Sequence, residues 1–347
     1  MRGLRQKTKA DFWLAALLFV LCSALVTPFI GFANVYDLNQ WLTYFPFSIV
    51  YSYGVLVWFY TLNLTDSTRK FRSKDLLLFL PTIIYLTFRL YLFAQDLDWK
   101  EWFWKNYGRN TDTVIFVTEF VWNLVFLYFS IRHYKKYRMW LNENFSDTEK
   151  VKFDWLRNFL YIFTAILILG AFFDFTNSFL FKLSYIQFFY FQLVLALVTY
   201  YLAVAGYLRS KTIELNFSET KSEEIEGRKT LLSEKELEKL KSKLQNLMQT
   251  EKPYLEPTIT LTDLSKNLGV NSTVLSYAIN NGFDKNFNDF INEFRIVEVK
   301  EKLKNANHST LLGIAYDCGF NSKATFNRAF KKFTGVSPKE FQENSAR

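Results

Sequence analysis

Cysteine and histidine are scarce in this sequence, which has only two of each among its 347 residues. Cys22 lies in an apolar stretch and Cys318 lies near the polar C-terminal end, so we do not expect them to form a disulfide bond. No Cys-x-x-Cys spacing occurs, and neither His133 nor His308 has another metal ligand at a useful spacing. These absences exclude a disulfide framework and a zinc finger, and we expect no metal site and no cofactor.

Sequence motifs of common catalytic and phosphate-binding sites are also missing. The chain has no glycine-rich phosphate loop and no nucleophile elbow. We therefore expect that the protein is not an enzyme.

Basic residues exceed acidic ones by nine, but the excess is unevenly placed. Residues 1–211 hold 22 Lys and Arg against 14 Asp and Glu, whereas residues 212–347 hold 20 against 19. The bulk positive charge therefore belongs to the N-terminal part and is no evidence for nucleic-acid binding. An argument for such binding has to rest on local clusters of cations.

Apolar residues concentrate before residue 209, and Phe alone occurs 38 times. Six apolar segments are long enough to cross a bilayer, because about 20 helical residues span a hydrocarbon core of about 30 Å. Trp and Tyr near their ends favour membrane spans over buried helices of a soluble protein. The first segment could be a signal peptide, but its apolar run is too long and no small-residue cleavage site follows, so we interpret it as a retained anchor. The expected spans are 12–33, 43–64, 75–95, 113–131, 158–181 and 185–208.

Charges in the connecting loops set the expected orientation, because Lys and Arg accumulate on the cytoplasmic side. Seventeen of them flank the spans on the side of the N-terminal tail, against four on the opposite side. This bias predicts a multi-pass protein of the cell inner (cytoplasmic) membrane, with the lipid bilayer as a partner and both termini in the cytoplasm.

Three charged residues fall inside the expected spans: Arg89, Glu119 and Asp174. Ionised groups at that depth are costly and usually face the interior of a helix bundle or a wet cavity. We expect them to line a polar pocket for intramembrane sensing that opens to the outer side, with Arg89 paired to one of the acids. In the alternative, Arg89 extends toward the interface and each acid is satisfied locally between helices.

Residues 212–230 are polar and rich in Glu, which is typical of a solvated linker. Ser233 and Glu236 form a capping box that predicts a helix to about Gln249. The apolar stripe of this helix could form a dimer or relay a signal, or it could pack on its own domain, which we favour. The stripe consists of Leu237, Leu240, Leu244 and Leu247. The expected domains are thus 1–208, 209–230, 231–252 and 253–347.

A first helix-turn-helix pattern follows at residues 258–281. Thr260 and Asp263 form a capping box, and Gly269-Val270-Asn271 predicts the turn. The second helix, 272–281, has an apolar face of Val274, Leu275 and Ile279. Its exposed face can hydrogen-bond to bases or phosphates and carries Thr273, Ser276, Tyr277 and Asn280.

A longer helix, 286–304, is expected to join this unit to a second one that opens at Ser309. The apolar positions of the joining helix are Phe290, Ile291, Phe294, Val297 and Leu303. Arg295 on the same helix is expected to contact DNA phosphate or to have a structural role.

In the second unit, Ile314, Ala315 and Phe320 form the core and Gly319 makes the turn. A helix at 322–333 then places Phe326, Phe330 and Phe333 on one face and cations and amides on the rest, while no acidic residue occurs between Cys318 and Lys339. Such a helix suits the DNA major groove. Ser337 before Pro338 caps a final short helix.

The run Gly313-Ile314-Ala315-Tyr316-Asp317-Cys318-Gly319-Phe320, with Phe326 to Lys332 and Gly335-Val336-Ser337-Pro338, resembles the signature of AraC/XylS-type transcriptional regulators. Leu275-Ser276 and Phe290-Ile291-Asn292 match the first unit and the joining helix of that family. The resemblance covers about residues 253–343. It implies a seven-helix domain whose two recognition helices enter successive major-groove segments about 34 Å apart. It also implies DNA contacts by Ser322, Lys323, Thr325, Asn327 and Arg328 in the second unit, with Lys331 and Lys332 on phosphate.

The sequence departs from the family in two respects. The first recognition helix has no Lys or Arg, so its base reading would be polar or apolar. Apolar spans stand where many members carry a soluble sugar-binding sensor, so the usual ligands of the family do not carry over.

The sequence thus predicts an all-α protein: a six-helix transmembrane domain, then a seven-helix AraC-type double helix-turn-helix domain. Its expected function is membrane-tethered, sequence-specific transcriptional regulation as a one-component sensor. The expected partners are double-stranded promoter DNA, RNA polymerase, an unidentified small-molecule or envelope signal, and a second copy of the chain. The alternatives are a membrane enzyme or transporter with a regulatory DNA-binding tail, and a regulator whose membrane half is only an anchor.

Overall fold

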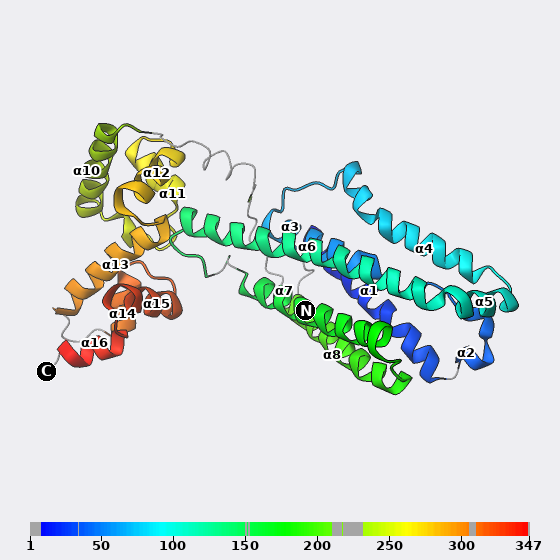
Figure 1. Cartoon of the computed structure of the whole chain (residues 1–347). Coiled ribbons are helices and arrows are strands. Elements are labelled where there is room, and N and C mark those ends of the chain that lie inside the picture. The colour runs from blue at the N-terminus through cyan, green and yellow to red at the C-terminus, as the bar shows by residue number, and fades with distance from the viewer. Residues whose placement is uncertain are drawn as a thin grey trace, which may run out of the picture. The chain divides into compact units, whose positions relative to one another are not determined.

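The computed structural model describes residues 8–33, 35–149, 151, 153–209, 217, 232–304 and 310–345 (Figure 1). Within these residues the chain forms helices joined by turns and loops, and it forms no strand. Two compact units form. Unit 1 comprises Met1–Lys135 and Phe153–Phe217, and unit 2 comprises Lys136–Lys152 and Ser218–Arg347. Residues 136–152, which we expected in the N-terminal domain, thus belong with the C-terminal unit.

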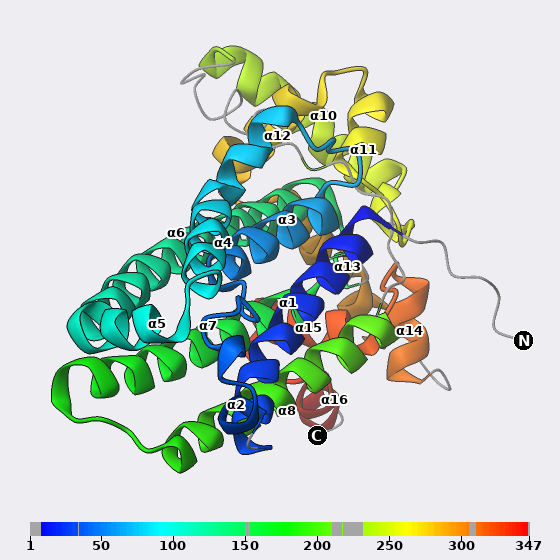
Figure 2. The ribbon, with the colours of Figure 1, turned by 90° about the vertical axis from the view of Figure 1, so that its right-hand side faces the viewer.

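Unit 1 is a bundle in which α1 lies beside α3 and α8 (Figure 2). Short 3₁₀ and π-helical turns at Gln40–Leu42, Val50–Ser52, Ser73–Phe79, Trp104–Gly108 and Thr176–Leu180 extend or connect the α-helices. The α-helices are α1 (Lys9–Phe32), α2 (Val35–Leu38), α3 (Tyr53–Thr65), α4 (Leu80–Phe93), α5 (Leu97–Phe103), α6 (Arg109–Asn144), α7 (Asp154–Phe175) and α8 (Tyr185–Arg209).

Five helical stretches of the described chain are long and apolar enough to cross a membrane, judged by length and composition. They are Lys9–Gly31, Ser73–Phe93, Leu97–Asn144, Asp154–Leu180 and Ile186–Tyr207. They correspond to the first and to the third through sixth expected spans. The second expected span, 43–64, is helical only from Tyr53 onward, apart from a 3₁₀ turn just before it. Tyr44 has a φ of 71° and Pro46 lacks a backbone donor, so the chain before Tyr53 does not form a regular helix.

Although α3 is short, it is largely enclosed by the bundle. Its Val55, Phe59 and Leu62 are buried together with Phe126 of α6. The polar backbone at its start is satisfied by Asn123 of α6, which is fully buried. The Asn123 side chain accepts from the Gly54 amide at 2.8 Å and donates to the Val50 carbonyl at 3.2 Å. Irregular backbone at membrane depth is tolerated only where protein groups or a wet cavity satisfy it in this way.

Unit 2 contains the C-terminal end of α6, the loop that follows it, and a set of helices arranged along α13 (Figure 1). One group, α10–α12, packs near one end of α13, and α14–α16 pack near the other. The helices are α10 (Glu234–Thr250), α11 (Leu261–Leu268), α12 (Ser272–Phe283), α13 (Phe287–Lys304), α14 (Leu311–Asp317), α15 (Lys323–Thr334) and α16 (Pro338–Ser345).

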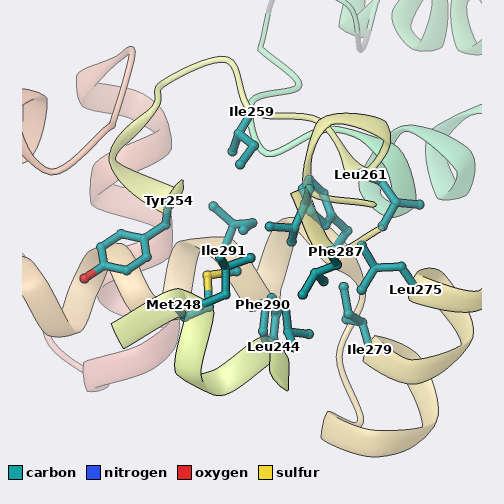
Figure 3. Close-up of a cluster of buried hydrophobic side chains, with 13 residues drawn as sticks. Leu244, Met248, Tyr254, Ile259, Leu261, Leu275, Ile279, Phe287, Phe290 and Ile291 are labelled. Atoms are coloured by element: carbon teal, nitrogen blue, oxygen red, sulfur yellow. The ribbon is translucent and has the colours of Figure 1, made fainter. Parts of the chain in front are cut away.

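The apolar stripe of α10 packs on its own domain, as we favoured from the sequence. Leu244 and Met248 lie against Phe290 and Ile291 of α13 in one buried cluster (Figure 3). Burial of each such side chain contributes about 1.5–3 kcal/mol. The predicted capping box of Ser233 and Glu236 is present at the start of α10. This helix is therefore part of the core of unit 2.

Two details of α13 and its surroundings differ from expectation. Val297 is 54% exposed, because the apolar face of the helix continues through Ile296 and Val299 instead. Ser309, where we expected the second helix-turn-helix unit to open, lies outside the described residues, and α14 begins at Leu311 with Thr310 as its N-cap.

Candidate functional site

The second helix-turn-helix unit consists of α14, a turn at residues 318–321, and α15. Gly319 makes the turn with a φ of 88°, a conformation that favours glycine. The turn also lies close to the segment before α11, since a Cβ at Gly319 would be 2.5 Å from the Tyr254 carbonyl oxygen. Both constraints fix where α15 begins.

The face of α15 that points into the core is aromatic, as the sequence predicted. Phe326 and Phe330 are buried with Ala329, and Phe333 packs against the same cluster. Ser322 is the N-cap, and its hydroxyl accepts from the Thr325 amide at 3.1 Å. Thr325 is only 8% exposed, so of the expected base-reading residues these two act in helix capping and packing.

The opposite face of α15 is exposed and carries the other residues expected to contact DNA: Lys323, Asn327, Arg328, Lys331 and Lys332. Lys332 pairs with Asp289 of α13 at 2.6 Å, and Arg328 pairs with Glu149 of the loop after α6. Among the described residues, the side chains of Lys323, Asn327 and Lys331 have no hydrogen-bond or ion-pair partner. Four cations and one amide on one helix face match the chemistry of phosphate and base-edge recognition.

The first helix-turn-helix unit is formed by α11 and α12. Thr260 and Asp263 form the predicted capping box, and Gly269 ends α11 with a φ of 67°. The buried residues of α12 are Leu275, Ala278 and Ile279, whereas Val274 is only partly buried. Of the polar residues expected to contact DNA, Asn280 is exposed and Thr273, Ser276 and Tyr277 are half-buried. This helix offers hydrogen-bonding groups but no cation.

Arg295 is fully buried, so its guanidinium does not contact phosphate from this position. Its Nε donates to the Tyr254 carbonyl at 2.7 Å and its Nη2 donates to the Glu256 carbonyl at 2.8 Å. The guanidinium also lies over the Phe320 ring, and burial lowers the pKa of Arg295 to about 10. Of the two roles expected from the sequence, the structure therefore supports the structural one, in which Arg295 ties α13 to the turn of the second helix-turn-helix unit.

Unit 1 contains a cavity of about 190 Å³ bordered by α1, α6, α7, α8 and the segment before α3. Glu119 of α6 and Asp174 of α7 both line it. Arg89 does not line the cavity. Its guanidinium lies 5.1 Å from the centre of the Tyr44 ring and makes no ion pair with Glu119 or Asp174. The pairing that we expected for Arg89 is therefore not formed.

Several residues that matter at these sites were not singled out from the sequence. Gln192 lines the cavity, and its buried Oε1 has no hydrogen-bond partner in the part of the chain that the structure describes. Asn123, Asn288 and Glu149 each contact segments far away in the sequence. No periodicity marks a single polar residue of this kind, although an Asn in an apolar span is itself a signal that the sequence offered.

Comparisons with known proteins agree with this geometry for the C-terminal part of the chain. A family model described as a helix-turn-helix domain matches residues 264–344. Uncharacterized HTH-type transcriptional regulators of Staphylococcus aureus, from strains COL, MSSA476 and N315, are each 33% identical over 89 residues. The match covers 26% of this chain and only 12% of each relative.

A solved structure of a protein of unknown function from Listeria innocua is also similar, at 26% identity over 29% of this chain and 95% of that chain, with a TM-score of 0.26. The family match confirms the helix-turn-helix part of the resemblance drawn from the sequence. Residues 264–344 thus match a helix-turn-helix domain, and the relatives that share this part of the chain are named as HTH-type transcriptional regulators.

Proposed function

We propose that the protein is a membrane-tethered, sequence-specific transcriptional regulator that acts as a one-component sensor. The observation that carries the proposal is the exposed cationic and amide face of α15, held by an aromatic core in a helix-turn-helix domain, on a chain with five stretches able to cross a membrane. Promoter DNA is the proposed partner of unit 2. Contact with RNA polymerase and pairing of two chains belong to the same proposal.

The proposed DNA contacts can be tested with the purified full-length protein in lipid nanodiscs. A duplex is first selected from a random pool by the wild-type protein, and affinity is then measured for Arg328→Ala. Loss of one base-reading side chain costs about 1–3 kcal/mol, so we expect binding to weaken by about 5-fold to 150-fold and specificity to relax. Lys239→Ala on the exposed face of α10 removes the same charge and serves as the control. Equal loss in both variants would mean that α15 does not read the sequence.

The proposed location is the cytoplasmic membrane with both termini inside. The charge bias of the loops favours an even number of crossings, whereas five helical stretches alone would place the termini on opposite sides. We assign the sixth crossing to residues 43–65, which combine α3 with the irregular backbone before it. The satisfaction of that backbone by Asn123 supports this assignment.

The proposed sensing site is the cavity lined by Glu119 and Asp174, which would take a small molecule or respond to an envelope signal. Arg89 lies outside the cavity wall and is proposed to stabilise the bundle near Tyr44. Glu119→Gln and Asp174→Asn should alter the response of target transcripts to growth conditions. Glu101→Gln, an exposed carboxylate of α5, should leave that response unchanged. Wild-type behaviour in all three variants would favour the reading of the membrane half as an anchor only.

A membrane enzyme or transporter with a regulatory DNA-binding tail is the alternative from another class. The same two acidic residues would then serve transport or turnover. A transport or turnover assay that responds to Glu119→Gln or Asp174→Asn, with transcripts unaffected, would favour that alternative.

A further inference from the structure

The loop that follows α6 lies against unit 2. We call residues 145–149 the α6–α7 loop. Phe145 forms an antiparallel β-bridge with Thr260, the N-cap of α11. The backbone amide of Ser146 donates to the Ile259 carbonyl at 3.3 Å, and its hydroxyl donates to the same oxygen at 2.8 Å. The loop therefore adds a short extended segment to the start of the first helix-turn-helix unit.

Polar side chains of α13 fasten the loop from the other side. The Asn288 amide donates to the Phe145 carbonyl at 3.0 Å and to the Ser146 carbonyl at 2.8 Å. Arg295 donates to the Ser146 hydroxyl at 3.3 Å, and Ser146 is fully buried. A buried polar group that is left without a hydrogen-bond partner destabilises the fold. This set of polar contacts, which we call the seat of the loop, therefore favours the docked state. The occupant is a segment of the same chain.

The end of the loop reaches the proposed DNA-reading face. The Glu149 amide donates to the Asp147 carboxylate at 3.0 Å, which turns the chain, and the Glu149 carboxylate pairs with Arg328 of α15. A carboxylate and a DNA phosphate or guanine edge compete for the same guanidinium. Glu149 would also repel phosphate. Docking of the loop and engagement of DNA by Arg328 therefore oppose each other.

The loop is also the direct continuation of α6. This helix runs unbroken from Arg109 to Asn144, which is about 54 Å at 1.5 Å per residue and longer than a hydrocarbon core of about 30 Å. Glu119 of the cavity wall lies on the same helix. A shift of α6 would thus move the loop without any diffusing messenger.

We propose that the α6–α7 loop is a latch that docks on the helix-turn-helix domain and withholds Arg328 from DNA until α6 moves. This inference rests on the proposed DNA-binding function and adds its regulation. The contacts of the loop with Ile259, Thr260 and Asn288 hold the latch in its seat. The ion pair of Glu149 with Arg328 is the part that competes with DNA.

The test uses the full-length protein in nanodiscs and the duplex selected by the wild type. Glu149→Gln removes the competing charge and should tighten DNA binding by up to about fivefold, the upper end of what loss of a partly exposed ion pair gives. Glu238→Gln, which breaks the Lys241 pair on α10, removes an equal charge and should change affinity much less. Equal effects of the two variants would overturn the latch, since the gain would then be general electrostatics.

A second variant leaves Glu149 in place and loosens the seat. Asn288→Ala should also tighten DNA binding, and it should speed amide hydrogen exchange at Ser146, whose N–H is bonded to the Ile259 carbonyl. Faster exchange with unchanged DNA affinity would overturn the latch but leave the proposed function standing. If neither the wild type nor any variant selected a DNA sequence, the proposed function would fail and the latch with it.

Discussion

Arg295 and Gly319 meet at one point of unit 2 and show what single residues contribute to this fold. A buried guanidinium is costly unless all of its donors are paired, and Arg295 pairs with carbonyls from the segment before α11. Gly319 allows the turn before α15 to approach the same carbonyls. The two residues together position the recognition helix of the second unit relative to α13.

We expect Gly319→Ala to destabilise the second helix-turn-helix unit strongly. A left-handed alanine costs about 1–3 kcal/mol, and its Cβ would also lie 2.5 Å from the Tyr254 oxygen. Gly269→Ala is the matched control, because its φ is 67° but no atom lies within 4 Å of the new Cβ. The measurement is the labelling rate of buried Cys318 in full-length protein with Cys22→Ser. Since 1.4 kcal/mol is a factor of ten, Gly319→Ala should label at least about tenfold faster than Gly269→Ala.

The salt dependence of DNA binding separates the roles of Arg295 and Lys331. Removal of a phosphate contact lowers the slope of log K against log salt concentration by about 1. We expect that change for Lys331→Ala, whose side chain is exposed on α15. Arg295→Met should instead speed Cys318 labelling and leave the slope of the remaining folded protein unchanged. A reduced slope for Arg295→Met with normal labelling would restore the phosphate contact as its role.

At the scale of elements, α13 connects the two helix-turn-helix units and the segment before α11. Glu298 of α13 accepts from Lys252 Nζ at 2.8 Å and from the Tyr254 hydroxyl at 3.0 Å. Partial burial of Glu298 acts to raise the pKa of its carboxyl, but these two donors outweigh it and hold the pKa below its usual range. The carboxylate thus fastens the chain before α11 to α13.

This lowered pKa makes the contact between α13 and the segment before α11 sensitive to acid. A group with a depressed folded-state pKa contributes stability above its unfolded pKa of about 4.3, and this stability is lost as the pH falls through the folded value. We expect amide exchange in α13, corrected for the intrinsic effect of pH, to accelerate as the pH falls below about 4.3. Glu298→Gln should flatten that part of the profile. An identical acid profile in the variant would show that Glu298 does not contribute.

The starts of helices and their buried faces were the features that the sequence predicted best. The capping boxes of α10 and α11 and the aromatic face of α15 are local patterns, and each is present in the structure. The docking of the α6–α7 loop was not predicted, because Ser146 contacts Ile259 through its backbone amide and its hydroxyl, and a single serine in a loop carries no periodic signal. The burial of Arg295 was left open for a related reason, since an arginine on an amphipathic helix suits either phosphate or buried carbonyls.

The topology of the proposed membrane half is the feature of the whole molecule that the sequence described least well. Five helical stretches meet the length of a membrane span, and α3, with 13 residues, covers only about 20 Å. A hydropathy profile does not register the positive φ of Tyr44 or the missing backbone donor of Pro46, which together interrupt the helix in the second segment. If the N-terminus lies inside, as we propose, the crossing of residues 43–65 decides which side of the proposed membrane the C-terminal unit occupies.

Reporter fusions can decide the number of crossings. We expect a reporter fused after Asn39 to lie outside the cell and one fused after Ser67 to lie inside, because residues 43–65 are proposed to cross between them. A fusion at the C-terminus should lie inside. If the first two fusions both lay outside the cell, residues 43–65 would not cross, and the C-terminal unit would then lie away from the chromosome.

Chromatin immunoprecipitation of the full-length protein in its own cells tests the central proposal most directly. We expect discrete promoter sites that share one sequence motif, retained by Lys239→Ala and lost or blurred by Arg328→Ala. Occupancy without a common motif, or a site pattern that Arg328→Ala leaves unchanged, would contradict the account of a membrane-tethered regulator that reads DNA through α15.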